Sequence, residues 1–240
     1  MESDVAKLAE KFRGKFVVFD GVDGSGKSTQ RDRVAEAFTA VGLPVQRCDD
    51  PGGTEVGDRI RAVLLEHDLS TMDIKCETLL FMASRAQLVA EVIRPALEAH
   101  KTVLCSRFVS ATCAYQGAAG DDPKRVLELA AFAIGDTWPD VTVLIDVDPK
   151  EGFGRTDRIP QHAGKNREKV ARRTAGQRTL FTDTQTDAME ARPLKFHREV
   201  RKIFLGVGDY YPTPVVVVDG SGDEETVHHR ILEALGRVTL

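Results

Sequence analysis

The chain has 240 residues, of which 42% are hydrophobic, 29% charged and 6% aromatic. These proportions are typical of a globular protein with a sizeable core, and they exclude a disordered or collagen-like chain. The formal net charge of −4 argues against a general nucleic-acid-binding protein, because such proteins present a basic surface to phosphates.

The N-terminus and the cysteines bear on the compartment. The first fifteen residues are polar and of mixed charge, without the apolar stretch of a signal peptide, and no apolar run approaches the length of a membrane span. The four cysteines, at positions 48, 76, 105 and 113, form no C-x-x-C motif. We therefore expect reduced thiols, a cytoplasmic location, and neither a membrane nor a nucleic-acid partner.

Five short runs rich in Val, Ile and Phe are expected to form buried parallel strands, because polar residues do not alternate with apolar ones in them. These runs are residues 16–19, 44–46, 102–104, 141–145 and 215–218. Helices are predicted at residues 28–41, 78–100, 124–134, 193–205 and 223–235. Pro95 should bend or split the second helix. The alternation of strands and helices predicts an α/β fold, and no linker divides residues 1–240 into domains.

Residues 21–28, GVDGSGKS, match G-x-x-x-x-G-K-[ST] between a predicted strand and a predicted helix. Glycines let backbone N–H groups surround phosphate oxygens, and the helix directs its positive end at the anion. Lys27 should reach the β- and γ-phosphates of ATP, and Ser28 should bind Mg²⁺. The complete motif in this context disfavours a chance glycine-rich turn, and the lack of N-K-x-D disfavours a GTPase. The ATP-binding candidates are Gly21, Asp23, Gly24, Ser25, Gly26, Lys27, Ser28 and Thr29.

Several segments, in order along the chain, resemble thymidylate kinases. They are FVVFDGVDGSGKSTQ (16–30), PGGT (51–54) with Arg61 beyond it, LFMASRAQLVAEVIRPAL (80–97), LCSRFVSATCAYQG (104–117), VLIDVDP (143–149) and FHREVR (196–201). The resemblance implies a P-loop NTPase fold of three α/β/α layers, with a five-stranded parallel sheet, flanking helices and a lid insertion. It also implies transfer of a phosphoryl group from ATP to dTMP with Mg²⁺, and a homodimer.

The residues support this reading. Phe81 and Arg85 are four apart and share a helix face, so that a ring could stack on a pyrimidine while a guanidinium donates to its carbonyl oxygens. The alternative is a core Phe beside a surface Arg. Arg107 follows a strand at its carboxyl end, where open α/β sheets bind ligands, and a fixed Arg suits a monophosphate. Its alternative is a structural salt bridge.

By resemblance, Thr112 and Gln116 lie near the base, and Tyr115 lies by the sugar, where it could exclude a 2′-hydroxyl. Ordinary helix packing is the alternative for these residues. The resemblance places Asp23 near the sugar 3′-hydroxyl and the metal. The alternative is a purely structural role, in which Asp23 only helps to form the turn.

A basic segment at about 150–180 is the predicted lid. Residues 150–178 contain nine Lys/Arg and three Asp/Glu, a local balance of +6. On charge alone, a solvated helix face is the alternative. In the family that the chain resembles, a catalytic arginine lies either in the P-loop or in the lid. The four variable P-loop positions here contain no Lys or Arg, so the resemblance implies that Arg155 and Arg158 are catalytic together with Lys27 and Arg107. Further candidates in the lid are Arg167, Arg172 and Arg173.

Three positions depart from the family. Ser106 replaces an acidic residue, so metal binding should rely on Ser28 and on Asp20 or Asp23. Asp49 and Asp50 replace Arg-Glu before PGGT, which removes one positive charge that Arg47 is not obviously placed to restore. Residues 187–190, DAME, lack an arginine. Two other functions are therefore weighed: a kinase of the same fold for another pyrimidine monophosphate, and a catalytically weakened nucleotide-binding protein.

Overall fold

The computed structural model describes residues 2–65, 72–156 and 192–240. Five strands form one sheet in the order β2-β3-β1-β4-β5, and every neighbouring pair is parallel. The strands are β1 Phe16–Asp20, β2 Val45–Asp49, β3 Thr102–Ser106, β4 Val141–Asp146 and β5 Val215–Asp219. All five predicted strands are confirmed, and each extends one to three residues beyond its predicted carboxyl end.

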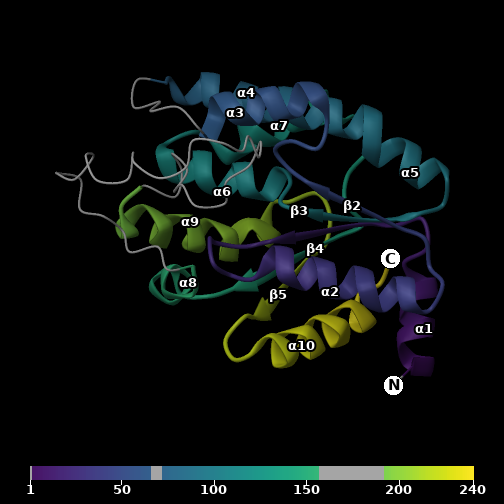
Figure 1. The fold of residues 1–240 in the computed structure, drawn as a ribbon. Coiled ribbons are helices and arrows are strands. Elements are labelled where there is room, and N and C mark those ends of the chain that lie inside the picture. Colours follow the sequence, from purple (N-terminus) through teal and green to yellow (C-terminus); the bar gives the residue numbers. More distant parts are fainter. Residues whose placement is uncertain (1, 66–71, 157–191) are drawn as a thin grey trace, which may run out of the picture.

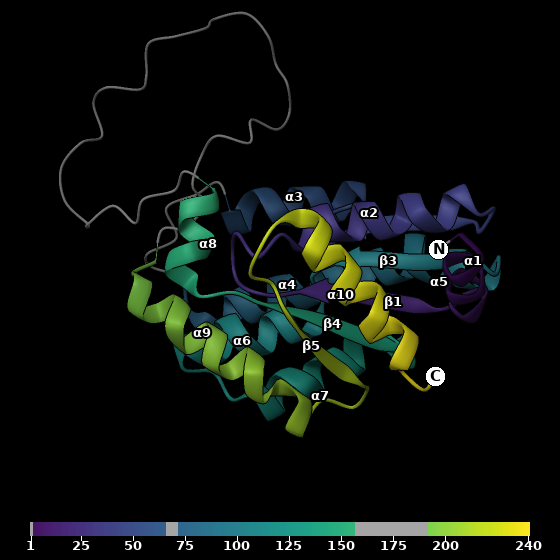
Figure 2. The same ribbon diagram turned by 90° about the horizontal axis from the view of Figure 1, so that it is seen from below.

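Helices cover both faces of the sheet, as Figures 1 and 2 show. They are α1 Glu2–Lys11, α2 Lys27–Ala40, α3 Glu55–Leu65, α4 Ile74–Leu88, α5 Arg94–Glu98, α6 Val109–Ala119, α7 Pro123–Ile134, α8 Pro149–Arg155, α9 Leu194–Gly206 and α10 Glu224–Arg237. Phe16 and Val18 of β1 join a core with α4 to α7, whereas Val17 and Phe19 join one with α1, α2 and α10. This is the predicted three-layer α/β/α arrangement. None of the described helices could span a membrane.

The edge strands correct one expectation. The central strands β1 and β3 are buried along their whole length, whereas β2 and β5 are mostly half-buried or exposed, with Val217 52% exposed. An apolar run without alternation therefore marks a strand here but not the burial of both its faces, because edge strands have a neighbour on one side only.

Pro95 splits the predicted long helix. A π-helical turn at Val89–Ile93 joins α4 to α5, and Pro95 lies in the first turn of α5. Proline cannot donate the backbone hydrogen bond that the preceding turn requires, and the irregular turn lies directly before it.

Candidate active site

The P-loop joins β1 to α2. Gly21, Gly24 and Gly26 have positive φ angles of 145°, 73° and 85°, which side-chain-bearing residues rarely adopt. Gly26 is the N-cap residue of α2. Because glycine has no side chain, it offers no side-chain acceptor to the first N–H groups of the helix. The Ser25 hydroxyl is buried and has no hydrogen-bond partner among the described residues. Open N–H groups and a hydroxyl without a partner fit phosphate oxygens.

Helix α8 packs directly on the P-loop backbone. A Cβ atom at Gly152 would lie 2.3 Å from the carbonyl oxygen of Asp23, and one at Gly24 would lie 1.9 Å from the oxygen of Gly152. Both positions therefore need glycine. The contact fixes the distance between α8 and the P-loop backbone. It therefore also fixes the position of Arg155, which lies in the last turn of α8.

Arg155 lies beside the P-loop, at the end of α8. Its guanidinium donates to the carbonyl oxygen of Gly220 at 2.9 Å and pairs with Glu151 at 2.7 Å. It lines a cavity, here called the Arg155 cavity, between the P-loop and the start of α10. The other lining residues are Gly24, Ser25, Gly26, Thr29, Gln30, Thr156, Gly222, Asp223, Glu224 and Val227. Arg158, Arg167, Arg172, Arg173 and the predicted lid beyond Thr156 lie outside the described residues.

A second cavity, here called the Phe81 cavity, brings together all seven predicted substrate-binding residues. They come from the P-loop, α4, the end of β3 and α6. The cavity is lined by Asp23, Asp50, Pro51, Arg61, Leu65, Phe81, Arg85, Arg107, Ala111, Thr112, Tyr115 and Gln116. Asp23 belongs to this cavity and its chain neighbour Gly24 to the Arg155 cavity, so the two cavities meet at the P-loop.

Arg107 is held in an unusual backbone conformation at the end of β3. Its φ angle is 68°, a left-handed value that is uncommon for a residue with a side chain. Its N–H donates to the carbonyl oxygen of Phe19 at 2.9 Å. The guanidinium pairs with Asp23 and lies 5.0 Å above the centroid of the Tyr115 ring. Backbone strain of this kind concentrates at functional sites, where it fixes a side chain.

Asp23 is surrounded by cationic and hydroxyl groups. Besides Arg107, its carboxylate accepts a hydrogen bond from the Tyr115 hydroxyl at 2.8 Å and lies 3.6 Å from the Lys27 ammonium. Burial acts to raise the pKa of Asp23, but Arg107, Lys27 and Tyr115 outweigh burial and hold the pKa at about 2. Asp23 is therefore an ionised link between the P-loop and α6, which a turn-forming role alone does not explain.

Arg85 lies in the interior rather than on the surface. Only 1% of it is exposed, and its Nε donates to Asp50 at 2.6 Å. Its Nη2 donates to the carbonyl oxygen of Phe108 at 3.1 Å and to the Thr112 hydroxyl at 2.9 Å. Asp50 thus fixes Arg85 in the Phe81 cavity. This role of Asp50 is not predicted from the sequence, in which its one signal is its place directly before PGGT.

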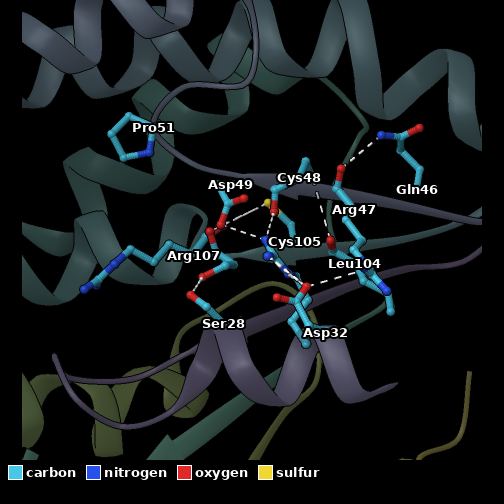
Figure 3. A network of polar contacts seen from close by, with 12 residues as sticks. Ser28, Asp32, Gln46, Arg47, Cys48, Asp49, Pro51, Leu104, Cys105 and Arg107 are labelled. Atoms are coloured by element: carbon cyan, nitrogen blue, oxygen red, sulfur yellow. Dashed lines mark hydrogen bonds and ion pairs between the residues drawn. The ribbon is translucent and has the colours of Figure 1, made fainter. Parts of the chain in front are cut away.

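The two departures at positions 106 and 49 lie on adjacent strands and pair with each other in the sheet register. Figure 3 shows Asp49 on β2 and Ser28 on α2. The Ser106 hydroxyl lies 3.1 Å from the Ser28 hydroxyl. Asp49 is exposed and pairs with Arg31 at 2.7 Å. Arg47 lies 3.7 Å from Asp32 and does not line the Phe81 cavity.

Arg61 is the third arginine that lines the Phe81 cavity, besides Arg85 and Arg107. It donates to the carbonyl oxygen of Pro51 at 2.7 Å and lines the cavity together with Arg107. The sequence places Arg61 beyond PGGT without marking it as a site residue, and in the fold it lies on α3, which packs against α4.

The described residues contain no cluster of three or more His, Cys, Asp or Glu suited to a metal ion. Asp20, one of the expected ligands, is fully buried, and its carboxylate accepts hydrogen bonds from the Gly21 N–H at 2.9 Å and the Ser110 hydroxyl at 2.6 Å. Both carboxylate oxygens of Asp20 thus have protein partners, and its expected role as a metal ligand stays a prediction. Ser28 and Ser106 leave a neutral hydroxyl pair beside the P-loop.

Comparisons with known proteins agree with this geometry. The sequence model of the thymidylate kinase family matches residues 19–231. A thymidylate kinase from Protochlamydia amoebophila is 36% identical over 94% of this chain and 93% of its own length. One from Geobacter sp. strain M21 is 39% identical, over 93% of this chain and 92% of its own.

The solved structures include a thymidylate kinase from Ehrlichia chaffeensis. It superposes with a TM-score of 0.67 at 27% sequence identity, over 93% of this chain and 99% of the other. The P-loop, the strained arginine at the end of β3 and the cavity between α4 and α6 thus lie in a fold shared with a protein of that name. The chain belongs to the thymidylate kinase family.

Proposed function

We infer that ATP binds over the P-loop with its base side toward the Arg155 cavity, and that dTMP binds in the Phe81 cavity. As a thymidylate kinase, the chain transfers the γ-phosphoryl group of ATP to dTMP and releases ADP and dTDP. The observation that carries this assignment is the junction at Asp23 and Gly24, where consecutive residues line the two cavities. A donor and an acceptor phosphate can meet only at such a junction.

The acceptor is bound by residues of complementary chemistry. Phe81 offers a ring for stacking on the base, and Arg85, Thr112 and Gln116 offer polar groups to its edge. The proposed role of Tyr115 is to contact the sugar, and its hydrogen bond to Asp23 supports this role because it fixes the ring.

Two guanidinium groups serve the monophosphate. Arg107 and Arg61 both line the cavity, and guanidinium groups match phosphate oxygens bidentately. We propose that Arg61 restores the positive charge that the sequence lacks at Asp49.

The transfer needs no general base, because the attacking phosphate oxygen is already ionised at neutral pH. Catalysis then consists of alignment and charge neutralisation. Lys27 and Arg155 act on the donor phosphates, and Arg107 holds the acceptor phosphate in line with them. Helix α8 sets the reach of Arg155 through its contact with the P-loop.

The hydroxyl pair fits a magnesium ion that is held mainly by nucleotide phosphates and waters, as Mg²⁺ commonly is. Ser28 would be the protein ligand, with Ser106 beside it. When bound, the ion would neutralise charge on the transferred group. The contacts of Asp23 with Arg107 and Lys27 speak against the metal role predicted for it.

We also propose a homodimer formed through α3, α4 and α7. Phe132 of α7 is 92% exposed, Leu79 of α4 is 53% exposed, and the two helices pack side by side. Val56 and Val63 of α3 extend this apolar surface. Light scattering should give twice the mass of the chain, and Phe132→Glu should halve it. A wild-type monomer would refute the dimer.

We also propose that the protein is located in the cytoplasm, because its four cysteines are free thiols.

The assay that tests the function measures ADP release with ATP and Mg²⁺ against dTMP, dUMP, UMP, CMP, AMP and GMP. We expect a strong preference for dTMP and loss of turnover in Lys27→Ala. Preference for another pyrimidine would overturn the acceptor assignment. The absence of turnover with every acceptor, with ATP still bound, would indicate a weakened nucleotide-binding protein.

A further inference from the structure

Glu77 does not line the Phe81 cavity, but it contacts Gln116, one of the lining residues proposed to bind the base. It is 6% exposed and belongs to α4, which packs against α6, as α9 does (Figure 1). Its carboxylate accepts a hydrogen bond from the Gln116 side-chain Nε2 at 2.7 Å. Arg192, just before α9, donates to both carboxylate oxygens, at 3.2 and 3.1 Å.

This contact determines the orientation of the Gln116 amide. A carboxylate paired with an arginine accepts hydrogen bonds and cannot donate them, so the amide must turn its nitrogen toward Glu77. The Gln116 side chain is 1% exposed and lines the cavity, and its Oε1 has no hydrogen bond among the described residues. The atom left for a bound base is therefore an acceptor.

The hydroxyl of Thr112, one helical turn before Gln116, is also oriented by its hydrogen bond. The Thr112 hydroxyl accepts a hydrogen bond from Arg85 at 2.9 Å, and a guanidinium can only donate. The Thr112 proton is therefore free to be donated elsewhere. Thr112 and Gln116 are four residues apart on α6 and share one face. Together they present one donor and one acceptor to the cavity.

We propose that Glu77 is a positioning residue for base specificity: by locking the Gln116 amide with Oε1 toward the base, it selects pyrimidines with an N3–H over those with an unprotonated N3. Thymine and uracil carry a donor at N3 beside a carbonyl at C4, which complements an acceptor beside a donor. Cytosine carries the reverse pattern. The inference rests on the proposed binding of dTMP in this cavity.

The test compares kcat/KM for dTMP, dUMP and dCMP in the wild type and in Glu77→Gln. The substituted side chain has the same shape but can donate as well as accept, so the Gln116 amide is free to turn over. We expect the ratio of dTMP to dCMP to fall at least tenfold, about 1.4 kcal/mol of discrimination, and the ratio of dTMP to dUMP to stay within threefold. A buried polar group facing the wrong base edge is the usual source of such discrimination.

Arg192→Gln is the matched control. It removes the same ion pair but leaves the carboxylate bonded to Gln116, so the dTMP to dCMP ratio should stay within threefold of the wild type. Equal losses for dTMP and dCMP in Glu77→Gln, or equal changes of the ratio in both variants, would show a merely structural ion pair and overturn the proposal.

A second variant keeps the test valid if Glu77→Gln does not fold. Gln116→Met removes the amide and should lower the dTMP to dCMP ratio at least tenfold. Where Glu77→Gln does fold, adding it to Gln116→Met should have no further effect on the ratio, because its effect passes through Gln116. An unchanged ratio in Gln116→Met would overturn the proposal. A wild-type protein that does not phosphorylate dTMP would instead refute the proposed function.

Discussion

Gly152→Ala tests whether the seating of α8 on the P-loop governs phosphoryl transfer. The new Cβ would lie 2.3 Å from the carbonyl oxygen of Asp23, whereas ordinary contacts begin near 3.4 Å. The neighbour is backbone of the P-loop and cannot rotate away. The helix and the loop must therefore separate by about 1 Å, and Arg155 and Asp23 move with them.

The expected effects follow from this displacement. A misplacement of about 1 Å in a catalytic constellation can lower the rate by about 10²-fold. Overpacking of this kind costs about 1–3 kcal/mol, which lowers the melting temperature of a chain of this size by several degrees. We expect the larger effect on kcat, since the displaced groups act on the transferred phosphate.

The matched control is Gly154→Ala, in the same helix. A Cβ at Gly154 meets no atom within 4 Å, so this variant gains only helix propensity, about 0.5–1 kcal/mol. ADP release at saturating dTMP and ATP, with melting temperatures, separates the two variants. If folded Gly152→Ala kept a kcat within twofold of that of Gly154→Ala, the reasoning would be refuted.

Three further predictions concern the two cavities. Phe81→Ala should raise the KM for dTMP about 5- to 150-fold, the range expected for the loss of one base–aromatic stack, with the KM for ATP unchanged; an unchanged KM for dTMP would exclude stacking. Ser106→Asp should lower the half-saturating Mg²⁺ concentration several-fold by placing a carboxylate beside Ser28, whereas Ser106→Ala should not; no difference between them would place the ion elsewhere. The folded pKa of Asp23, about 2, lies below the ordinary 3.8, so its ionised form stabilises the fold above pH 4, by about 2 kcal/mol, and this stability is lost as pH falls toward 2. Thermal melts should therefore lose stability more steeply over that range in the wild type than in Asp23→Asn, and parallel curves would contradict this.

The sequence predicts the parts of the site that local pattern encodes. The P-loop is specified by glycine spacing between a strand and a helix, and Arg107 by its place after β3. Helices α1, α3, α6 and α8 lie outside the five ranges predicted as helices, although Val5, Leu8 and Ala9 in α1 have helical spacing and are half-buried or buried.

Other features depend on residues that meet only in the folded chain. The Asp50–Arg85 pair joins positions 35 apart, and the Gln116–Glu77 bond positions 39 apart. No local periodicity links such residues, so one sequence shows the members but not the pairs. Edge exposure of β2 and β5 likewise follows from strand order, which the apolar runs do not contain.

The central claim is that donor and acceptor phosphates meet at Asp23 and Gly24. The affinity of an adenosine and a thymidine joined through their 5′ oxygens by five phosphates tests this most directly, since such a compound can reach both cavities at once. Calorimetry should give a Kd at least about 10²-fold lower than that of either ADP or dTMP, because the second half binds at high effective concentration. A Kd no lower than that of the tighter single nucleotide would mean that the two cavities do not serve one reaction.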